Sequence, residues 1–312
     1  MLMLDAATTR NSLPMKGLVE ALRAMFRNGC EMPVRHHHFI EMKGEDTAKL
    51  LLMPAWISGK YVGVKIANVF PGNSARGMAA VNASYMLMSG ATGQNLALID
   101  GGELTARRTA AASALAADYL TRKNASHLLV VATGRLALNI VEAYQAVRDL
   151  KRVTFWGRNP SKAEAVAAEA RALGINADAA SDLKTAVMAA DMISCATLSS
   201  EPLIHGDWLK PGQHLDLIGA FTTEMRESDD ECMRVANVFV DTMAGGTKEA
   251  GDIVLAIRSG ALKQEDIRAD LYALTRGEHT GRASAQDITL FKSVGAALED
   301  LAGAILAYET NR

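Results

Sequence analysis

Short apolar runs alternate with helical patterns between residues 127 and 241. This alternation is typical of parallel strands joined by crossover helices. We expect helices over 135–150 and 161–174, the second ending at a C-cap-like Gly174. The expected strands cover residues 127–131, 152–156, 191–196, 214–219 and 237–241. The sequence therefore predicts an α/β fold with a doubly wound parallel sheet.

The flanking segments follow a different pattern. A helix is expected over 14–29, and apolar runs at 49–57, 60–70 and 95–104 favour a mostly antiparallel or mixed sheet. An alanine-rich helix over 105–123 links the two parts. The apolar helix 295–309 has no obvious place in the parallel sheet, so we expect it to return to the first part. The predicted domains are 1–111 with 293–312, of α+β type, and 112–292.

Composition excludes several classes of partner. The 312 residues are 49% hydrophobic and 22% charged, with a net charge of -2, so no basic field is available for nucleic acid. The start of the chain has no signal-like pattern, and no stretch approaches the roughly 20 apolar residues of a membrane span. The 3 cysteines are far apart and suggest neither a disulfide framework nor a zinc site. We expect a cytoplasmic protein that binds neither nucleic acid nor membrane.

The turn after the first predicted parallel strand carries small residues at three spaced positions. A Rossmann-type dinucleotide site needs one for the tight turn, one where the backbone approaches the pyrophosphate, and one where helix meets sheet. Ala132, Gly134 and Ala137 stand at these positions. Gly134 keeps the position where a side chain would collide with phosphate, whereas Ala132 only makes the turn less permissive. An ordinary strand–turn–helix is the alternative interpretation.

The second predicted strand ends in cationic and polar residues. An NAD site would place Asp or Glu here for the ribose 2′-OH. This chain has Arg158, Asn159, Ser161 and Lys162 instead, which are hydrogen-bond donors suited to a 2′-phosphate. A solvated basic loop is the alternative. The context of strand, turn and helix favours NADPH over NADH.

Motifs along nearly the whole chain make it resemble the ornithine cyclodeaminase/mu-crystallin family. They run from MPVRHHH through MPAW, GVKIANVFPGN, LTARRTAAASALAADYL, PLIHGDWLKPGQHLDLIGA and EAGD to ITLFKSVGAALEDLA. The resemblance implies a homodimer whose first domain forms the dimer interface and encloses the substrate together with the nucleotide domain. It also implies a small amino acid or cyclic imino acid as substrate, bound beside a nicotinamide.

Three cations match the family's carboxylate clamp: Arg35, Lys65 and Arg108. A carboxylate is best held by a bidentate cation, and we expect Arg108 near a helix N-terminus, which would favour the anion further. Arg108 and Lys65 would act at the reaction centre, with Lys65 helping to deliver a proton. By family position, the cofactor would be lined by Thr109, Thr133, Gly134, Arg135, Leu136, Thr197 and Ser293.

The chain departs from cyclodeaminases at Phe221. Cyclodeaminases carry an Asp two residues after the glycine of this strand, where it handles the side-chain amine of ornithine. Phe221 leaves no carboxylate for a second amino group, and suits the methylene face of a ring. We therefore expect NADPH-dependent reduction of cyclic ketimine carboxylates, 1-pyrroline-2-carboxylate and 1-piperideine-2-carboxylate, to L-proline and L-pipecolate.

Three alternatives remain open on the same scaffold. They are an ornithine cyclodeaminase, an alanine-type amino-acid dehydrogenase, and a non-catalytic NADPH-binding protein. A metal centre is not expected, because His36, His37 and His38 would alternate faces on a strand and cannot converge on one ion. We expect these histidines at the surface or at the rim of a site.

Overall fold

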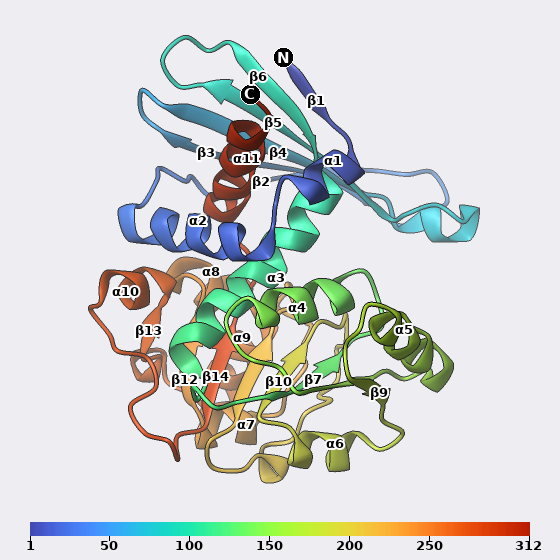
Figure 1. The fold of residues 1–312 in the computed structure, drawn as a ribbon. Coiled ribbons are helices and arrows are strands. Elements are labelled where there is room, and N and C mark those ends of the chain that lie inside the picture. Colours follow the sequence, from blue (N-terminus) through green and yellow to red (C-terminus); the bar gives the residue numbers. More distant parts are fainter. The chain divides into compact units, whose positions relative to one another are not determined.

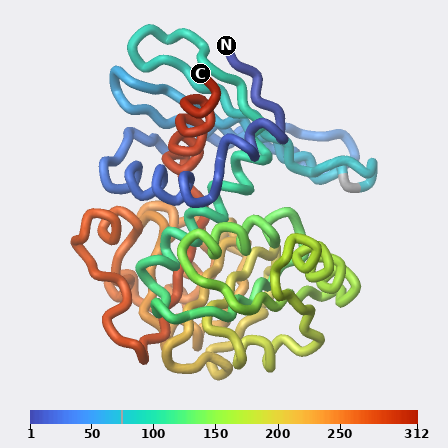
Figure 2. The backbone as a smooth tube through the Cα atoms, viewed as in Figure 1, coloured from blue at the N-terminus to red at the C-terminus, as the bar shows by residue number. Residues whose placement is uncertain are grey.

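The computed structural model describes residues 1–73 and 75–312. The chain forms two compact units, which Figures 1 and 2 colour along the sequence. Unit 1 comprises Met1–Arg108 with Ala296–Arg312, and unit 2 comprises Thr109–Gly295. The boundary falls within helix α3 (Gly101–Leu120), so this helix contributes residues to both units.

Unit 2 is built on an eight-stranded sheet in the order β13-β12-β14-β11-β10-β7-β8-β9, and every strand pair in it is parallel. The predicted doubly wound α/β fold is confirmed. Its strands are β7 (His127–Val131), β8 (Arg152–Trp156), β9 (Ala177–Ala179), β10 (Met192–Cys195), β11 (His214–Leu217), β12 (Asn237–Val240), β13 (Ala269–Asp270) and β14 (Thr289–Lys292).

Helices lie on both faces of this sheet (Figure 1). Alternate strand residues such as Ile193 and Leu215 join one apolar core with residues of α6, α7 and α9. On the opposite face, Asp216 accepts hydrogen bonds from Ser194 of the neighbouring strand, Ser113 of α3 and Tyr144 of α4. The helices of the unit are α4 (Leu136–Gln145), α5 (Pro160–Ala172), α6 (Leu183–Ala189), α7 (Asp230–Val235), α8 (Met243–Glu249), α9 (Gly251–Ser259) and α10 (Leu271–Arg276), with 3-10 turns η2 (Gly206–Trp208) and η3 (Gln264–Asp266).

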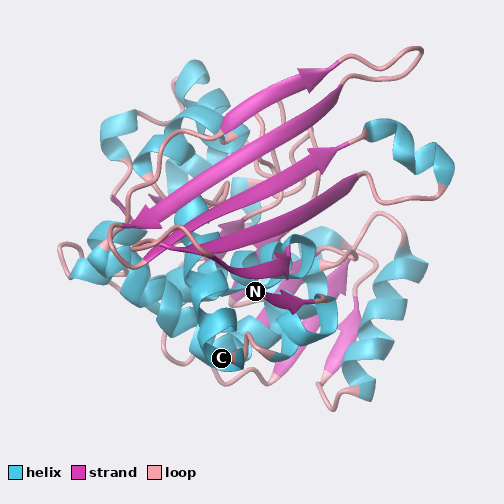
Figure 3. Cartoon of the chain, turned by 90° about the horizontal axis from the view of Figure 1, so that it is seen from above, coloured by secondary structure: helices cyan, strands magenta, loops and turns pink.

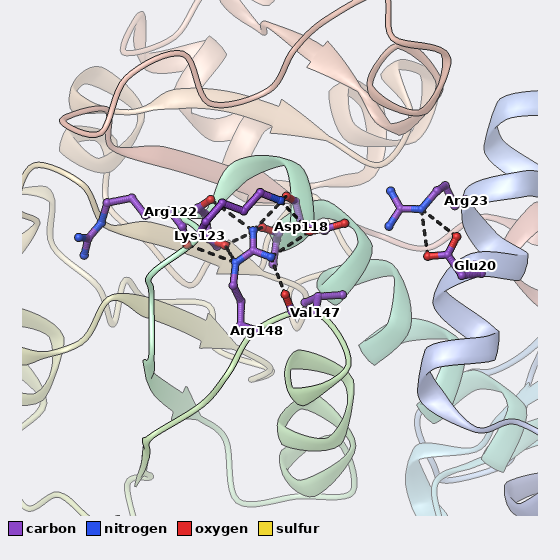
Figure 4. A network of polar contacts seen from close by, with 9 residues as sticks. Glu20, Arg23, Asp118, Arg122, Lys123, Val147 and Arg148 are labelled. Atoms are coloured by element: carbon purple, nitrogen blue, oxygen red, sulfur yellow. Dashed lines mark hydrogen bonds and ion pairs between the residues drawn. The ribbon is translucent and has the colours of Figure 1, made fainter.

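Arg148 ties the end of α3 to the segment after α4, as Figure 4 shows. Its Nη1 donates to Asp118 Oδ1 at 2.9 Å and to the Val147 carbonyl at 2.6 Å. Its Nε donates to the Arg122 carbonyl at 3.2 Å, and Lys123 adds an ion pair to Asp118. The cation thus satisfies main-chain groups where the chain leaves α3 and enters β7.

Unit 1 contains a six-stranded mixed sheet in the order β1-β6-β5-β4-β3-β2, in which only the β1–β6 pair is parallel among the described residues. The expected mixed sheet is therefore present. Its elements are β1 (Leu2–Leu4), α1 (Ala6–Asn11), α2 (Met15–Asn28), β2 (His36–Ile40), β3 (Ala48–Ile57), β4 (Tyr61–Val69), η1 (Pro71–Arg76), β5 (Val81–Ser89), β6 (Asn95–Asp100) and α11 (Ala297–Asn311).

Helix α11 packs on one face of this sheet and also contacts α2. Residues that alternate along β4 therefore differ in burial: Lys65 and Ala67 are buried beneath the helices, whereas Ile66 is 37% exposed. In the view of Figure 3 the long strands of this sheet lie uncovered by helices of the unit. The sheet thus has one packed face and one open face.

Two expectations about the bounds of elements were wrong, and some strands were not predicted. The apolar run 95–104 ends as a strand at Asp100, because the Asp100 carboxylate accepts the Glu103 N–H at 2.7 Å and starts α3 there. The linking helix consequently begins at Gly101 rather than 105. The short strand β14 was not predicted, although it lies between β11 and β12.

Candidate functional site

The first candidate site is a cavity of about 250 Å³ in unit 2. It is lined mainly by residues at or just after the carboxyl ends of β7, β8 and β10. Since β7 continues to β8 on one side and pairs with β10 on the other, the cavity lies where the strand order reverses. Parallel α/β sheets bind ligands at this switch point. The lining residues are Ala132, Thr133, Gly134, Trp156, Gly157, Arg158, Ala196, Thr197, Leu198, Ser199 and Leu203.

The cavity fits a dinucleotide in two respects. A Cβ at Gly134 would meet no protein atom within 4 Å, so the open space beside this turn is available to a ligand. Helix α4 starts directly after it, and its N-cap residue Arg135 makes no side-chain cap hydrogen bond. The first N–H groups of a helix are a favourable place for phosphate. No carboxylate is present among the lining residues.

The basic turn after β8 also fits a phosphate. Arg158 and Lys162 are exposed, and neither forms an ion pair with another described residue. By contrast, the neighbouring Arg152 pairs with Asp178 at 2.6 Å, and Arg171 pairs with Glu164 at 2.5 Å. Asn159 has a structural role, because its Oδ1 accepts the N–H groups of Ser161 and Lys162 and caps α5.

The predicted cofactor residues divide into two groups. Thr133, Gly134, Arg158 and Thr197 line the cavity. Ser293 is buried and donates its hydroxyl proton to Asp241 Oδ2 at 2.8 Å. The others lie outside the set of lining residues: Thr109, Arg135, Leu136, Asn159, Lys162 and Ser293. Phe221 is 50% exposed in the loop that follows β11.

The second candidate site is a buried charged cluster in unit 1. Lys65 Nζ lies 2.7 Å from Asp300 Oδ2, and Arg108 Nε lies 3.0 Å from Asp300 Oδ1. Arg108 Nη1 also lies 2.7 Å from Glu299 Oε2. The four side chains are at most 6% exposed, so they interact in a medium of low polarity.

Arg35 adds a third positive charge to this cluster, since its field acts on Lys65. The structure therefore brings together the three cations that the sequence predicted. The four side chains in direct contact, Lys65, Arg108, Asp300 and Glu299, balance in formal charge.

The pKa values of the cluster follow from its burial and its ion pairs. Burial lowers the pKa of Lys65 most strongly, and the positive charges of Arg108 and Arg35 lower it further. Asp300 raises it in part, and the resulting pKa is about 8. Burial also lowers the pKa of Arg108, but the two carboxylates outweigh it and raise the value. Burial raises the pKa of Asp300, yet Lys65 and Arg108 outweigh that effect and lower it. Asp300 is therefore ionised at neutral pH.

One expectation about the clamp was wrong. Arg108 does not lie near a helix N-terminus, because α3 begins at Gly101 and Arg108 is two turns inside it. The charge that supports Arg108 comes instead from Asp300 and Glu299 in the first turn of α11. The free N–H groups at the start of α3 are thus too far along the helix to assist.

Sequence reasoning missed three residues of the cluster. Asp300 and Glu299 stand inside the apolar helix 295–309, and an acidic pair at buried positions of such a helix was the available signal. Tyr85 faces Lys65 directly across the β4–β5 pair, is fully buried, and has a hydroxyl without a hydrogen-bond partner in the structure. A Cβ at Gly63 would strike this hydroxyl. Tyr85 therefore offers a buried donor on the face of the sheet that carries Lys65.

His36, His37 and His38 are exposed along β2, as expected. The described residues contain no group of His, Cys, Asp or Glu suited to a metal ion. Cys195 and Cys232 are buried in the core of unit 2. Within the described residues no helix is both long enough and apolar enough to cross a bilayer.

Comparison with known proteins identifies the family. The model of the ornithine cyclodeaminase/mu-crystallin family matches residues 1–312. The Delta(1)-pyrroline-2-carboxylate reductase of Paracoccus denitrificans is 39% identical over 83% of this chain and 82% of its own length.

Two solved structures resemble the whole chain. That of the Delta(1)-pyrroline-2-carboxylate reductase of Thermococcus litoralis, in complex with NADH and L-proline, is 31% identical with a TM-score of 0.92, covering 99% of this chain and 97% of the other. That of an archaeal alanine dehydrogenase dimer with bound NAD is 30% identical with a TM-score of 0.90, covering 99% and 95%. This chain, with its buried cation cluster and its switch-point cavity, belongs to the ornithine cyclodeaminase/mu-crystallin family.

Proposed function

We propose that the protein reduces cyclic ketimine carboxylates with NADPH. Its substrates would be 1-pyrroline-2-carboxylate and 1-piperideine-2-carboxylate, and its products L-proline and L-pipecolate. The observation that carries the proposal is the buried cluster in which Asp300 orients Lys65 and Arg108, two cations that match the carboxylate clamp. The chain is an oxidoreductase acting on C=N bonds, because its relatives include reductases of 1-pyrroline-2-carboxylate.

The residues of unit 1 would bind and orient the substrate. Arg108 would donate a bidentate pair of hydrogen bonds to the carboxylate, and Arg35 and Lys65 would complete its neutralisation. Asp300 fixes the two inner cations by ion pairs, so the clamp is formed before substrate arrives. Holding the ring by its carboxylate restricts the orientation of the imine carbon.

Lys65 would also deliver a proton to the imine nitrogen. Reduction of C=N adds a hydride to carbon, and the nitrogen must carry a proton for the carbon to be electrophilic. With a pKa of about 8, Lys65 is mostly protonated at pH 7 yet able to release a proton. A reduced nicotinamide, when bound, supplies the hydride.

The cavity of unit 2 would hold the dinucleotide. The turn at Gly134 and the start of α4 would face the pyrophosphate. Arg158 and Lys162, which form no ion pair with another described residue, would bind the 2′-phosphate and favour NADPH over NADH. The solved relatives named above hold NADH or NAD, so this preference is a property that we propose for this chain.

The open face of the unit 1 sheet supports assembly as a homodimer. Apolar side chains are exposed or partly exposed there on three adjacent strands, with polar residues of β4 and β5 at one end: Leu52, Pro54, Val62, Val64, Ile66, Met86 and Met88. A contiguous apolar sheet face typically marks a protein interface. We assign it to a second copy of this chain, as in the alanine dehydrogenase that is described as a dimer.

The test is NADPH consumption with a panel of substrates. The panel contains both cyclic imines, pyruvate with ammonia as the alanine-dehydrogenase arm, and ornithine with NAD. The proposal predicts fastest turnover of a carboxylated cyclic imine with NADPH. Faster turnover of pyruvate with ammonia, or release of ammonia from ornithine at a rival rate, would assign the chain to another activity of the family.

A further inference from the structure

The carboxylate of Glu227 is fully buried in unit 2 and accepts four hydrogen bonds. Its Oε1 accepts the Thr197 N–H at 2.6 Å and the Thr197 hydroxyl at 2.8 Å. Its Oε2 accepts the N–H groups of Gly219 at 2.8 Å and Ala220 at 3.2 Å. One side chain therefore satisfies main-chain donors from two different loops.

These two loops follow adjacent parallel strands. Thr197 comes two residues after β10 and lines the switch-point cavity, whereas Gly219 and Ala220 come just after β11 and lead into Phe221. A Cβ at Gly219 would strike the Thr197 backbone and Glu227 Oε1, so the two loops and the carboxylate are in close contact. Glu227 thus fixes the spacing of the loops at the edge of the sheet where ligands bind.

Lys292 and Asp252 hold the carboxylate in turn. Lys292 Nζ lies 2.9 Å from Asp252 Oδ2 and 3.9 Å from Glu227 Oε2, and all three side chains are fully buried. Asp252 Oδ1 accepts the N–H groups of Glu227 at 2.8 Å and Ser228 at 3.0 Å. Burial raises the pKa of Glu227 to about 7, and the charge of Lys292 opposes this rise, so Lys292 favours the ionised form of the carboxylate.

We propose that Glu227, supported by Lys292, is a positioning residue for the nicotinamide cofactor. It holds Thr197 in the wall of the cavity and sets the path of the loop that carries Phe221. It acts through these loops and is not itself among the residues that line the cavity. The inference rests on the proposed function in one respect, that the cavity takes the dinucleotide.

The substitution Glu227→Gln tests this role, because an amide nitrogen would face N–H donors where an acceptor is needed. Asp216→Asn is the matched control. Asp216 is equally buried on β11 and accepts hydrogen bonds from Ser194 and Tyr144, but neither partner lines the cavity. The measurements are thermal unfolding and the Kd of NADPH and of NADH from nicotinamide fluorescence.

We expect Glu227→Gln to raise the Kd by at least about tenfold, because Thr197 and the loop after β11 would no longer be held in the geometry that binds the dinucleotide. Asp216→Asn should lower the unfolding temperature while leaving the Kd within about twofold. An unchanged Kd in folded Glu227→Gln, or an equal rise in both variants, would overturn the proposal. If the unaltered protein binds neither dinucleotide, the proposed function fails as well, which is a distinct result.

A second test needs no disruption of the buried charges. Thr197→Ser keeps the hydroxyl that Glu227 accepts, whereas Thr197→Val removes it. The valine variant should bind the dinucleotide several-fold more weakly than the serine variant. Equal binding by both variants would contradict the role of this hydrogen bond.

Hydrogen exchange of the unaltered protein completes the test even if Glu227→Gln does not fold. The Thr197 amide is bonded to Glu227, whereas Leu198 beside it is 71% exposed. After correction for intrinsic rates, we expect Thr197 to exchange at least about a hundredfold more slowly than Leu198. Comparable rates would show that Glu227 does not hold the loop.

Discussion

Lys65 Nζ lies 2.7 Å from Asp300 Oδ2, in an ion pair that joins strand β4 to helix α11 inside unit 1. The other oxygen of Asp300 faces Arg108 Nε at 3.0 Å. A single carboxylate therefore orients both inner cations of the proposed clamp. Because α11 comes from the C-terminal end of the chain, the clamp is complete only when residues 296–312 have packed on the sheet of unit 1.

Asp300→Asn should destabilise the protein and weaken the clamp together. Removing one partner of a buried ion pair leaves an uncompensated charge and costs about 3–5 kcal/mol. Thermal or denaturant unfolding measures this loss. Asp178→Asn is the control, because its pair with Arg152 is 44–52% exposed and should contribute about 0–1 kcal/mol. Equal effects of the two substitutions would show that the Asp300 pair has no special role.

The affinity for an anionic inhibitor should fall as the pH rises through about 8. The charged form of Lys65 binds the carboxylate, and burial together with Arg108 and Arg35 lowers its pKa from 10.5 to about 8. The measurement is the Ki of pyrrole-2-carboxylate against pH, because this planar ring has no imine nitrogen that titrates. In Lys65→Arg the charge persists at high pH, so the loss near pH 8 should disappear. Its persistence would assign the titration to another group.

The same pKa shift should make the stability of the protein rise with pH, whereas the affinity for the anionic inhibitor falls. The lowered pKa means that between about pH 8 and 10.5 the unfolded chain binds more protons at this position than the folded chain. The contribution of Lys65 to the free energy of unfolding should therefore rise with pH across that window. Comparison of the unaltered protein with Lys65→Met at several pH values isolates it.

Arg158→Ala should raise the KM for NADPH by at least about tenfold and barely affect the KM for NADH. The reason is that Arg158 lines the cavity and forms no ion pair with another described residue, so a 2′-phosphate is its natural partner. Arg152→Ala removes a cation at the start of β8 that is already paired, and should leave both values within about twofold. Equal use of both cofactors by the unaltered protein would refute the preference.

Ornithine should not be cyclised. Phe221 is exposed in the loop after β11 and supplies no carboxylate for a distal amine. The assay is release of ammonia and proline from ornithine, measured beside imine reduction. Phe221→Asp is the companion variant and should gain affinity for ornithine if this position decides the substrate class. Ammonia release by the unaltered protein at a rate near that of imine reduction would be incompatible with the account.

The parallel sheet could be predicted from the sequence because each buried strand has its own apolar run. β7 and β8 have the expected bounds for this reason. β14 was missed because it begins with Thr289 and ends with Lys292, a lysine that is buried by its ion pair with Asp252. Burial of a charged side chain depends on partners distant in sequence, and an apolar pattern does not reveal them.

The cations of the clamp could be predicted from motifs, but their supporting carboxylates could not. Glu299 and Asp300 stand in an apolar helix, and only the packing of α11 on β4 shows that they meet Lys65 and Arg108. The start of α3 was misplaced because Asp100, at the end of a strand-like run, acts as its cap. Local propensity gave the helix, while a single side-chain hydrogen bond decided its first turn.

The most direct test of the central claim is kcat/KM for 1-pyrroline-2-carboxylate with NADPH in Arg108→Ala, compared with 1-pyrroline, which lacks the carboxylate. The account predicts a loss of at least about tenfold for the carboxylated ring and little further loss for the other. Arg108→Lys should restore part of the lost kcat/KM. Arg107→Lys is the control: the side chain of Arg107 donates to the Leu13 carbonyl, so this substitution should leave the ratio of the two kcat/KM values unchanged. Unchanged turnover of 1-pyrroline-2-carboxylate by Arg108→Ala, with NADPH still bound, would contradict the proposed clamp and the reductase that depends on it.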